Sequence, residues 1–352
     1  MTSTSTEGAG TTFLIPAALA GPSGGSRYNE CLVNALEAIG HPVCILGVPG
    51  SWPRPGDADL LALGTALAGR SQVVIDGLMA SAAPEEIRAA VAAGTRVHIL
   101  FHLSLLAEGG LAPAEAERVR AGEHGALRAA HTVICTSNWA ADDVVDRYGP
   151  LPTVVVLPGT TPAPLAGGSS PPHLLMLASL TPRKNQLAVL RALASLTDLP
   201  WRTRLVGPDT MAPDYARRVR DFAATTFAPE RVQVTGALTG SELEEIWAGT
   251  DLLLLVSRAE TFGMVVTEAL AHGIPAVVGA GTGAEEALAL AGAALPGAAV
   301  EPDDPVALEA VLRHWLTTAS RRASWQHAAV NARDRLPTWN QSANHMLRIL
   351  AP

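Results

Sequence analysis

Short apolar runs alternate with longer amphipathic stretches along nearly the whole chain, and this pattern predicts an α/β fold. In the first half, the runs expected as strands are Thr12–Pro16, Val43–Leu46, Gln72–Asp76, Arg96–Phe101, Thr132–Thr136 and Thr153–Leu157. In the second half, they are His173–Ala178, Thr203–Val206, Arg231–Thr235, Asp251–Val256 and Pro275–Val278. Strands that are apolar on both faces and separated by helices are typical of doubly wound parallel sheets.

The strand series occurs twice, and a stretch rich in Pro, Gly and Ser from Pro158 to Pro172 lies between the two copies. Such a composition is typical of a linker. We therefore predict two Rossmann-like domains, residues 1–165 and 166–337, that face each other across a cleft. Ligands of such sheets bind outside the carboxyl ends of the strands. The tail after Pro305 predicts three helices, at Ala307–Leu316, Ser320–Arg333 and Thr338–Leu350.

The composition agrees with two apolar cores and excludes one class of partner. The chain has 352 residues, of which 48% are hydrophobic and 16% are charged. That length suggests roughly two domains. The net charge of −8 argues against nucleic acid as a partner, because a phosphate backbone requires a basic surface.

Cysteine usage and the N-terminal residues predict a cytoplasmic protein. Cys31, Cys44 and Cys135 lie in or beside apolar runs without metal-like spacing, so we expect buried thiols in a reducing compartment. The segment Met1 to Gly10 has no Lys or Arg and does not resemble a signal peptide. No apolar run reaches the ~18 residues of a membrane span. The use of Arg and Ala suggests a GC-rich bacterial genome.

A single lysine marks the first candidate for chemistry. Lys184 is the only lysine among the 25 Lys and Arg residues, and it follows the strand His173–Ala178 in the segment Leu180 to Asn185. A helix is expected directly after it, at Leu187–Leu196. A strand-to-helix turn presents backbone N–H groups to an anion, and Lys and Arg are not interchangeable at a phosphate. The position therefore predicts a phosphate ligand.

Two carboxylates mark the second candidate. Glu260 and Glu268 stand eight positions apart, the first in the loop after strand Asp251–Val256 and the second within the helical run Met264–His272. They cannot form an adjacent acid/base pair on one helical face, but they can bind two parts of one extended ligand. A carboxylate repels phosphate, so hydroxyl groups are the expected partners. Gly263 would let the backbone approach the ligand.

With this order and spacing, the second half resembles the donor-binding domain of the retaining glycosyltransferases of family 4, which have the GT-B fold. The resemblance runs through three segments of this chain, residues 173–184, 260–275 and 283–288. The Glu-x7-Glu block with Phe262 and Gly263 is its specific part. The first half matches more loosely, through Gly21 to Gly25 and His102. The last helix of this chain, with Trp339, resembles the segment that returns to the N-terminal domain in that fold. We therefore expect residues 338–352 to return to the first domain.

The resemblance implies a role for each site residue. The diphosphate of a nucleoside diphosphate sugar would be held by Lys184, with Arg183 as a second cation. The donor sugar would contact Glu260, Phe262, Gly263 and Met264, and Glu268 would bind the ribose hydroxyls. In the first domain, Gly24 and Gly25 would let the backbone approach the distal phosphate, and His102 would lie beside the transferred sugar. Catalytic roles thus fall to His102, Lys184 and Glu260.

The implied activity is a metal-independent hexosyltransferase that retains the anomeric configuration. We expect no cofactor and no metal, because no Asp-x-Asp of the metal-binding type and no cluster of His or Cys ligands stands out. The acceptor stays open between a glycan, a lipid-linked molecule and a small molecule, and so does peripheral membrane association. Neither the nucleotide base, the donor sugar, the oligomeric state nor the pathway follows from the sequence.

One departure from the family pattern keeps other interpretations open. The family carries Arg five residues before the lysine, and this chain has Ser179 there. A sugar-nucleotide epimerase or a disaccharide phosphorylase of the same fold could use the same groups, and a non-catalytic partner subunit could have kept the fold alone. Among the remaining candidates, His98 is expected in the core and Asp76 as a helix cap. Trp52 could be a stacking platform or a packed loop anchor.

Overall fold

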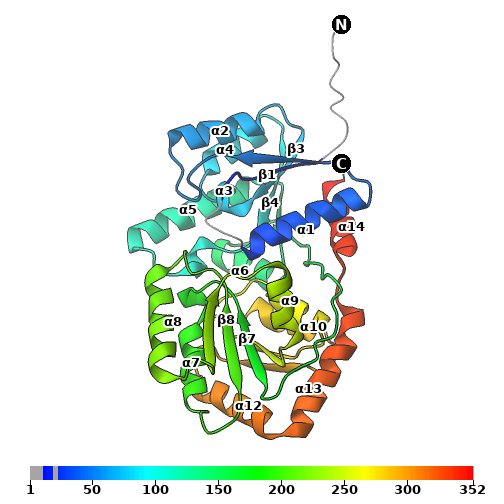
Figure 1. Ribbon diagram of the computed structural model, residues 1–352. Helices are drawn as coiled ribbons and strands as arrows, with labels where there is room; N and C mark the ends of the chain where they lie inside the picture. The colour runs from blue at the N-terminus through cyan, green and yellow to red at the C-terminus, as the bar shows by residue number, and fades with distance from the viewer. Residues whose placement is uncertain (1–10, 19–22, 352) are drawn as a thin grey trace. The chain divides into compact units, whose positions relative to one another are not determined.

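The computed structural model describes residues 11–18 and 23–351, which form two compact units (Figure 1). Unit 1 comprises residues 11–18, 24–159 and 339–351, and unit 2 comprises residues 23 and 160–338. The unit boundaries thus fall at Gly159–Thr160 and Thr338–Trp339. The C-terminal helix belongs to unit 1, where it packs against the first helix.

Unit 1 contains a six-stranded parallel sheet in the order β2-β1-β3-β4-β5-β6. Its strands are β1 Thr11–Pro16, β2 Val43–Val48, β3 Gln72–Asp76, β4 Arg96–Phe101, β5 Thr132–Cys135 and β6 Thr153–Val155. Its helices are α1 Gly24–Ala38, α2 Asp57–Leu67, α3 Gly77–Ala80, α4 Pro84–Ala92, the 3₁₀ helix η1 Leu105–Glu108, α5 Pro113–Ala129, α6 Asn138–Tyr148 and α14 Trp339–Leu350.

Side-chain alternation along the central strands builds two apolar layers in unit 1. One set, with Leu14 and Ile75, packs against α2, α4, α5 and α6. The opposite set includes the buried residues Phe13 and Leu100. The helices α1 and α14 lie side by side (Figure 1). A strand buried on both faces therefore reads as a continuous apolar run, which is why β3 and β4 could be predicted with the bounds that the structure shows.

Unit 2 contains a second six-stranded parallel sheet, in the order β12-β11-β10-β7-β8-β9. Its strands are β7 His173–Leu177, β8 Arg202–Val206, β9 Val232–Gly236, β10 Leu252–Leu255, β11 Ala276–Gly279 and β12 Gly297–Val300. Its helices are η2 Pro182–Lys184, α7 Gln186–Ala194, α8 Pro213–Thr226, α9 Gly240–Ala248, α10 Met264–Ala271, α11 Gly283–Ala289, α12 Pro305–Thr317, α13 Ala319–Ala332 and η3 Arg333–Arg335.

The core of unit 2 is built in the same way. Leu174 and Leu254 face a cluster with α7, α8 and α12, in which Trp315 is fully buried. Neighbouring positions such as Leu253 lie on the other face, where α10 packs against α11 and α13. The predicted doubly wound α/β fold with two Rossmann-like units is confirmed.

Each strand order contains one switch point, and these points position the candidate residues. In unit 1 the order reverses between β1 and β3, and in unit 2 it reverses between β7 and β10. The chain leaves such neighbouring strands toward opposite faces, which opens a crevice at their carboxyl ends. Gly25 follows β1 and Asp76 is the last residue of β3, while the segments after β7 and β10 carry Lys184 and Glu260.

Several sequence predictions are corrected by the structure. The strand β12 was missed, because its sequence Gly-Ala-Ala-Val has little apolar weight. Cys44 is exposed rather than buried, because β2 is an edge strand whose faces are only partly covered, and Cys31 is half-buried. Cys135 is buried as predicted, and burial raises the pKa of its thiol to about 12.

The proposed linker is attached to unit 2 over most of its length. Ala166 N donates to His272 O at 2.9 Å, and Gly167 N donates to Ala248 O at 2.9 Å. The Asp251 carboxylate then accepts from the Ser169 hydroxyl at 2.8 Å and from the backbone N–H of His173 at 2.8 Å. The polar composition of this stretch therefore reflects hydrogen bonding along the amino ends of the strands of unit 2.

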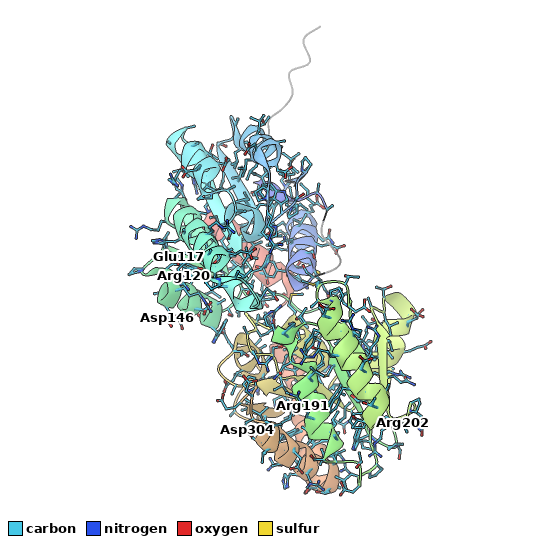
Figure 2. All side chains as sticks on the ribbon, turned by 90° about the vertical axis from the view of Figure 1, so that its left-hand side faces the viewer. Glu117, Arg120, Asp146, Arg191, Arg202 and Asp304 are labelled. Atoms are coloured by element: carbon cyan, nitrogen blue, oxygen red, sulfur yellow. The ribbon has the colours of Figure 1, made fainter. Side chains whose placement is uncertain are left out.

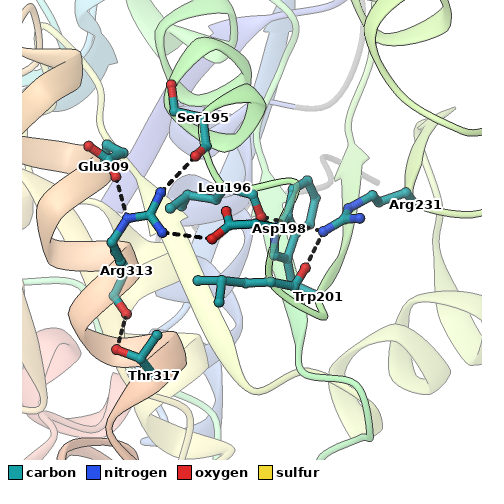
Figure 3. Close-up of polar contacts among 9 residues, drawn as sticks. Ser195, Leu196, Asp198, Trp201, Arg231, Glu309, Arg313 and Thr317 are labelled. Atoms are coloured by element: carbon teal, nitrogen blue, oxygen red, sulfur yellow. Dashed lines mark hydrogen bonds and ion pairs between the residues drawn. The ribbon is translucent and has the colours of Figure 1, made fainter.

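Exposed charged residues lie on the outer helices, in loops and at the start of β8. Six of them are labelled in Figure 2, namely Glu117, Arg120, Asp146, Arg191, Arg202 and Asp304, and all are exposed. A more organised group surrounds the loop after α7 (Figure 3). There Arg313 donates to Glu309, Asp198 and the carbonyl of Ser195, and the Arg231 guanidinium lies 4.3 Å from the centre of the Trp201 ring. No helix within the described residues is long and apolar enough to cross a bilayer.

Candidate active site

The turn that carries Lys184 is held from both sides. After β7 the chain forms η2 and passes through Asn185, which has a left-handed backbone (φ 61°) and is 1% exposed. The Asn185 side-chain amide donates to Pro302 O, and the Gln186 amide donates to Ser179 O at 2.8 Å. An Asn tolerates this backbone conformation better than most residues. Lys184 is therefore presented by a fixed turn.

The loop that carries Glu260 is tied to this turn. Arg258 N donates to Arg183 O at 2.8 Å, and the Arg258 guanidinium donates to Pro182 O at 2.6 Å. The same guanidinium forms a 2.7 Å ion pair with Asp303. The segments after β7 and β10 therefore form one assembly at the carboxyl end of the sheet.

Three charged side chains meet within this assembly. The Lys184 ammonium donates to the Glu260 carboxylate, and Arg183 Nη1 lies 3.9 Å from the same Glu260 oxygen. Arg183 also donates to Ala259 O at 2.9 Å, and the Ser257 hydroxyl lies 3.4 Å from Glu260. The three charged side chains are only 12–14% exposed. Burial raises the pKa of Glu260, but Lys184 and Arg183 outweigh that effect and hold its pKa below the ordinary value.

The structure also positions the other predicted residues of this unit. Phe262 is buried, at 2% exposure, so its side chain belongs to the core and its backbone forms the loop. Gly263 has a left-handed backbone (φ 83°) and caps α10, of which Met264 is the first residue. Glu268 lies in the second turn of α10 and is half-buried. The placement of Glu260 in the loop and Glu268 in the helix is confirmed.

One glycine that was not singled out individually is essential to the loop. Gly283 N donates to Glu260 O at 2.7 Å, and a Cβ at this position would lie 2.1 Å from Thr261 O. Only a residue without a side chain permits this approach. Gly283 could have been identified from the sequence, because it is a glycine at the first position of the helical run that became α11.

The two glycines of unit 1 differ from each other. Both lie in the first turn of α1 rather than in a loop, and the preceding Gly21 and Pro22 lie outside the described residues. A Cβ on Gly25 would lie 2.9 Å from His102 Cδ2, whereas a Cβ on Gly24 would meet nothing within 4 Å. The close approach to the histidine ring therefore requires glycine at position 25 only.

His102 is the first member of a chain of polar side chains drawn from three elements. Its Nε2 lies 2.8 Å from Asn29 Oδ1, and Asn29 Nδ2 donates to Asp76 Oδ2 at 2.8 Å. Asp76 also caps α3, because its Oδ1 accepts from Leu78 N at 2.9 Å. Burial lowers the pKa of His102, and the nearby Asp76 carboxylate opposes part of that effect. Asn29, which sequence reasoning missed, links the two.

The histidine ring is also tied to the C-terminal helix. The ring of Tyr28 packs edge-on against His102 on one side and against Trp339 of α14 on the other, with centroid distances of 5.4 and 5.6 Å. The Tyr28 hydroxyl donates to Val156 O at 2.9 Å. The return of the C-terminal helix to unit 1 thus supports the segment that carries His102.

The remaining candidates have structural roles. His98 is buried in β4 as expected, and burial lowers its pKa to about 4. Trp52 is a packed loop anchor, since it lies against the core of unit 1 with its Nε1 3.3 Å from Val48 O.

One Asp-x-Asp sequence, Asp57-Ala58-Asp59, was overlooked. It lies in the first turn of α2, where Asp59 accepts from Ser51 N and Gly56 N at 3.1 and 3.0 Å. Within the described residues, no group of three or more His, Cys, Asp or Glu could hold a metal ion.

The comparison with known families matches most of unit 2. The sequence model of the family Glycosyl transferases group 1 covers residues 163–332, which include both segments of the charged assembly. This segment is similar to that family. The chain is 29% identical to D-inositol 3-phosphate glycosyltransferase 1 of Catenulispora acidiphila, over 65% of this chain and 59% of the relative. It is 28% identical to D-inositol 3-phosphate glycosyltransferase of Stackebrandtia nassauensis, over 64% of this chain and 55% of that relative.

The chain therefore spans somewhat more than half the length of these curated relatives.

Solved structures extend the similarity of fold to both units. Sucrose-phosphate synthase from Thermosynechococcus elongatus superimposes with a TM-score of 0.76 at 20% identity, covering 97% of this chain and 98% of that one. HepE from Anabaena in complex with UDP-glucose superimposes with a TM-score of 0.75 at 17% identity, covering 96% of this chain and 99% of that one. The predicted GT-B fold class is confirmed.

Proposed function

We propose that this protein transfers a glycosyl group from a nucleoside diphosphate sugar to an acceptor, with retention of the anomeric configuration. The observation that carries the proposal is the assembly of Lys184, Arg183 and Glu260 beside the start of α10. It lies at the switch point of a doubly wound sheet, within the segment that matches the glycosyl transferases group 1. Such switch points are where these folds bind nucleotides.

The charge chemistry of the assembly supports the proposal. When a glycosidic bond to a diphosphate breaks, negative charge builds on the leaving group. Two cations and the backbone N–H groups at a helix start can stabilise that charge without reorganising. In the structure, Lys184 and Glu260 form an ion pair. A bound diphosphate would compete for Lys184 and leave Glu260 to accept from sugar hydroxyls.

Arg183 supports full activity despite Ser179. The family's usual arginine is missing at position 179, which is half-buried in the turn that follows β7. Arg183 reaches to 3.9 Å from the Glu260 carboxylate, so the assembly contains a second cation from another position. A guanidinium can bind phosphate oxygens through two parallel N–H groups. We propose that Arg183 replaces the missing charge and that catalysis needs no metal ion.

In unit 1, the carboxyl ends of β1, β3 and β4 would receive the transferred sugar and the acceptor. Gly25 and His102 touch each other there, and His102 is 18% exposed and therefore accessible to a ligand. Glu268 on α10 would bind the ribose. HepE from Anabaena, which has the same fold, was solved in complex with UDP-glucose, and a UDP-sugar is therefore the first donor to test. The acceptor stays open between a glycan, a lipid-linked molecule and a small molecule, and we place the reaction in the bacterial cytoplasm.

The experiment is a donor screen with the full chain. UDP-, GDP-, dTDP- and ADP-sugars are incubated with an acceptor panel, with and without EDTA, and release of the nucleoside diphosphate is measured. We expect acceptor-dependent release that EDTA does not change, and an NMR spectrum of the product that shows the anomeric configuration of the donor. Lys184→Ala should abolish release. Arg191→Ala, on the exposed face of α7, is the matched cationic control and should leave it unchanged.

The same screen separates the rival functions. A new nucleotide sugar formed without acceptor would indicate an epimerase, and release that requires inorganic phosphate with a disaccharide would indicate a phosphorylase. Nucleotide binding without turnover under any condition would indicate a non-catalytic subunit. Normal release by Lys184→Ala would contradict the central assignment.

A further inference from the structure

The orientation of one buried amide in unit 1 determines which nitrogen of His102 carries the proton. Asn29 lies in α1 and is 7% exposed, and it stands between His102 and Asp76. Asp76 is 8% exposed at the end of β3. The three side chains are separated by 26 to 73 residues along the chain and meet only in the folded protein.

The argument starts at Asp76, whose two carboxylate oxygens have different partners. Oδ1 accepts from the backbone N–H of Leu78, and Oδ2 lies 2.8 Å from the amide of Asn29. An ionised carboxylate only accepts hydrogen bonds. The nitrogen of the Asn29 amide must therefore face Asp76, and its oxygen must face His102.

The amide oxygen in turn requires a donor. Asn29 Oδ1 lies 2.8 Å from His102 Nε2, so Nε2 must carry a hydrogen. A neutral imidazole has one protonated nitrogen, which leaves Nδ1 as a hydrogen-bond acceptor. Within the described part of the chain, Nδ1 makes no hydrogen bond.

We propose that Asn29, oriented by Asp76, is a positioning residue that holds His102 in the Nε2–H tautomer and leaves Nδ1 to accept a hydrogen bond from a ligand hydroxyl. The ligand part of this inference rests on the proposed function. Because Nδ1 then carries no hydrogen, it cannot bind a ligand group that only accepts hydrogen bonds, such as an ionised phosphate oxygen. The amide thereby contributes to the choice of ligand without touching it.

His98, in the strand β4 that directly precedes His102, provides an internal reference. Its Nε2 lies 2.9 Å from Gln72 Nε2, and that Gln72 nitrogen also donates to Leu350 O at 3.1 Å. The carbonyl fixes the orientation of the Gln72 amide, so His98 Nε2 must accept. Two histidines four residues apart are thus bound to amides of opposite orientation.

The test is the two-bond proton–nitrogen correlation spectrum of the histidine-labelled full chain above pH 7, with signals assigned by His102→Gln and His98→Gln. We expect a protonated Nε2 and an unprotonated Nδ1 for His102. A protonated Nδ1 in the wild type would overturn the inference, and this measurement requires no substitution at Asn29 or Asp76.

Asp76→Asn sharpens the test. Asparagine is also a good helix cap, so its oxygen should keep the bond from Leu78 and its nitrogen should face Asn29. The Asn29 amide then reverses, and His102 should switch to the Nδ1–H tautomer while the His98 signals stay in place. With a donor sugar, kcat/KM should fall about tenfold, the equivalent of one hydrogen bond. Unchanged His102 signals in this variant would overturn the inference.

The outcomes separate this inference from the proposed function. No turnover with any nucleotide sugar, together with a protonated His102 Nε2, would contradict the proposed function and leave the role of Asn29 in place. Turnover together with a protonated His102 Nδ1 would support the proposed function and contradict the role of Asn29.

Discussion

The candidate residues of the two units use different chemistry. In unit 2, Lys184, Arg183 and Glu260 form a compact group of charges carried by two adjoining loops. In unit 1, His102, Asn29 and Asp76 form a chain of hydrogen bonds between segments of three elements. Charge attracts a ligand and tolerates small displacements, whereas a hydrogen-bonded chain transmits orientation. Substitutions in unit 2 should therefore change affinity, and those in unit 1 should change turnover.

The largest effect is expected for Gly283→Ala. The added Cβ would lie 2.1 Å from Thr261 O, so the loop that carries Glu260 must move. We expect destabilisation of about 3 kcal/mol or more and loss of nucleotide binding. Chemical denaturation and calorimetry measure the two effects. Gly64→Ala, where the Cβ would meet nothing, is the control, and an equal loss in both variants would show that the clash has no importance.

Gly25→Ala tests unit 1 in the same way. The Cβ would lie 2.9 Å from the His102 ring, which must shift by a few tenths of an ångström. We expect a loss of about 1–2 kcal/mol in stability and a lower kcat with the KM of the donor nearly unchanged. Gly24→Ala is the matched control and should be neutral or stabilising. If Gly24→Ala lowers kcat as much, the contact with His102 is not what requires glycine.

The charge group of unit 2 should appear in the pH dependence of stability. Lys184 and Arg183 hold the pKa of Glu260 below its ordinary value, against the effect of burial. The resulting stabilisation is complete above the pKa of the unfolded state, about 4.3, and is lost as the pH falls through the folded-state pKa. Melting temperatures between pH 6 and pH 3 should therefore fall less steeply for Glu260→Gln than for the wild type. Glu117→Gln, an exposed control, should follow the wild type, and three parallel curves would contradict the coupling.

The smallest effect is expected away from both groups, at the arginine shown in Figure 3. Arg313 is 39% exposed and pairs with Asp198 and Glu309, and it donates to Ser195 O. Screening by solvent weakens such pairs, so Arg313→Ala should lower the stability only slightly, without changing nucleotide affinity. Arg217→Ala, which breaks only a fully exposed pair with Asp214, should cost less still. A larger change in affinity than in stability would link this cluster to the site.

The same difference between the units explains what could be predicted from sequence. Lys184, Glu260 and Glu268 lie in two short segments of unit 2, so their order and spacing carry the signal. Asn29 was missed because its partners are 47 and 73 residues away, and only the strand order brings them together.

The limits of the fold prediction have equally specific causes. The strands β3 and β4 were predictable because both faces are buried. The edge position of β2, which exposes Cys44, depends on strand order, and the Ala-rich β12 owes its existence to pairing with β11 rather than to its own sequence. Neither the order of the strands nor their pairing is encoded in a local pattern.

The most direct test of the account is calorimetric binding of UDP, GDP, dTDP and ADP to the wild type, Lys184→Ala and Arg191→Ala. The account predicts that one nucleotide binds the wild type and Arg191→Ala equally, and that Lys184→Ala loses about 10- to 100-fold in affinity, as expected for a charge-assisted hydrogen bond. Equal affinity of all three proteins for that nucleotide would contradict the assignment of Lys184 to the diphosphate, and with it the proposed donor site.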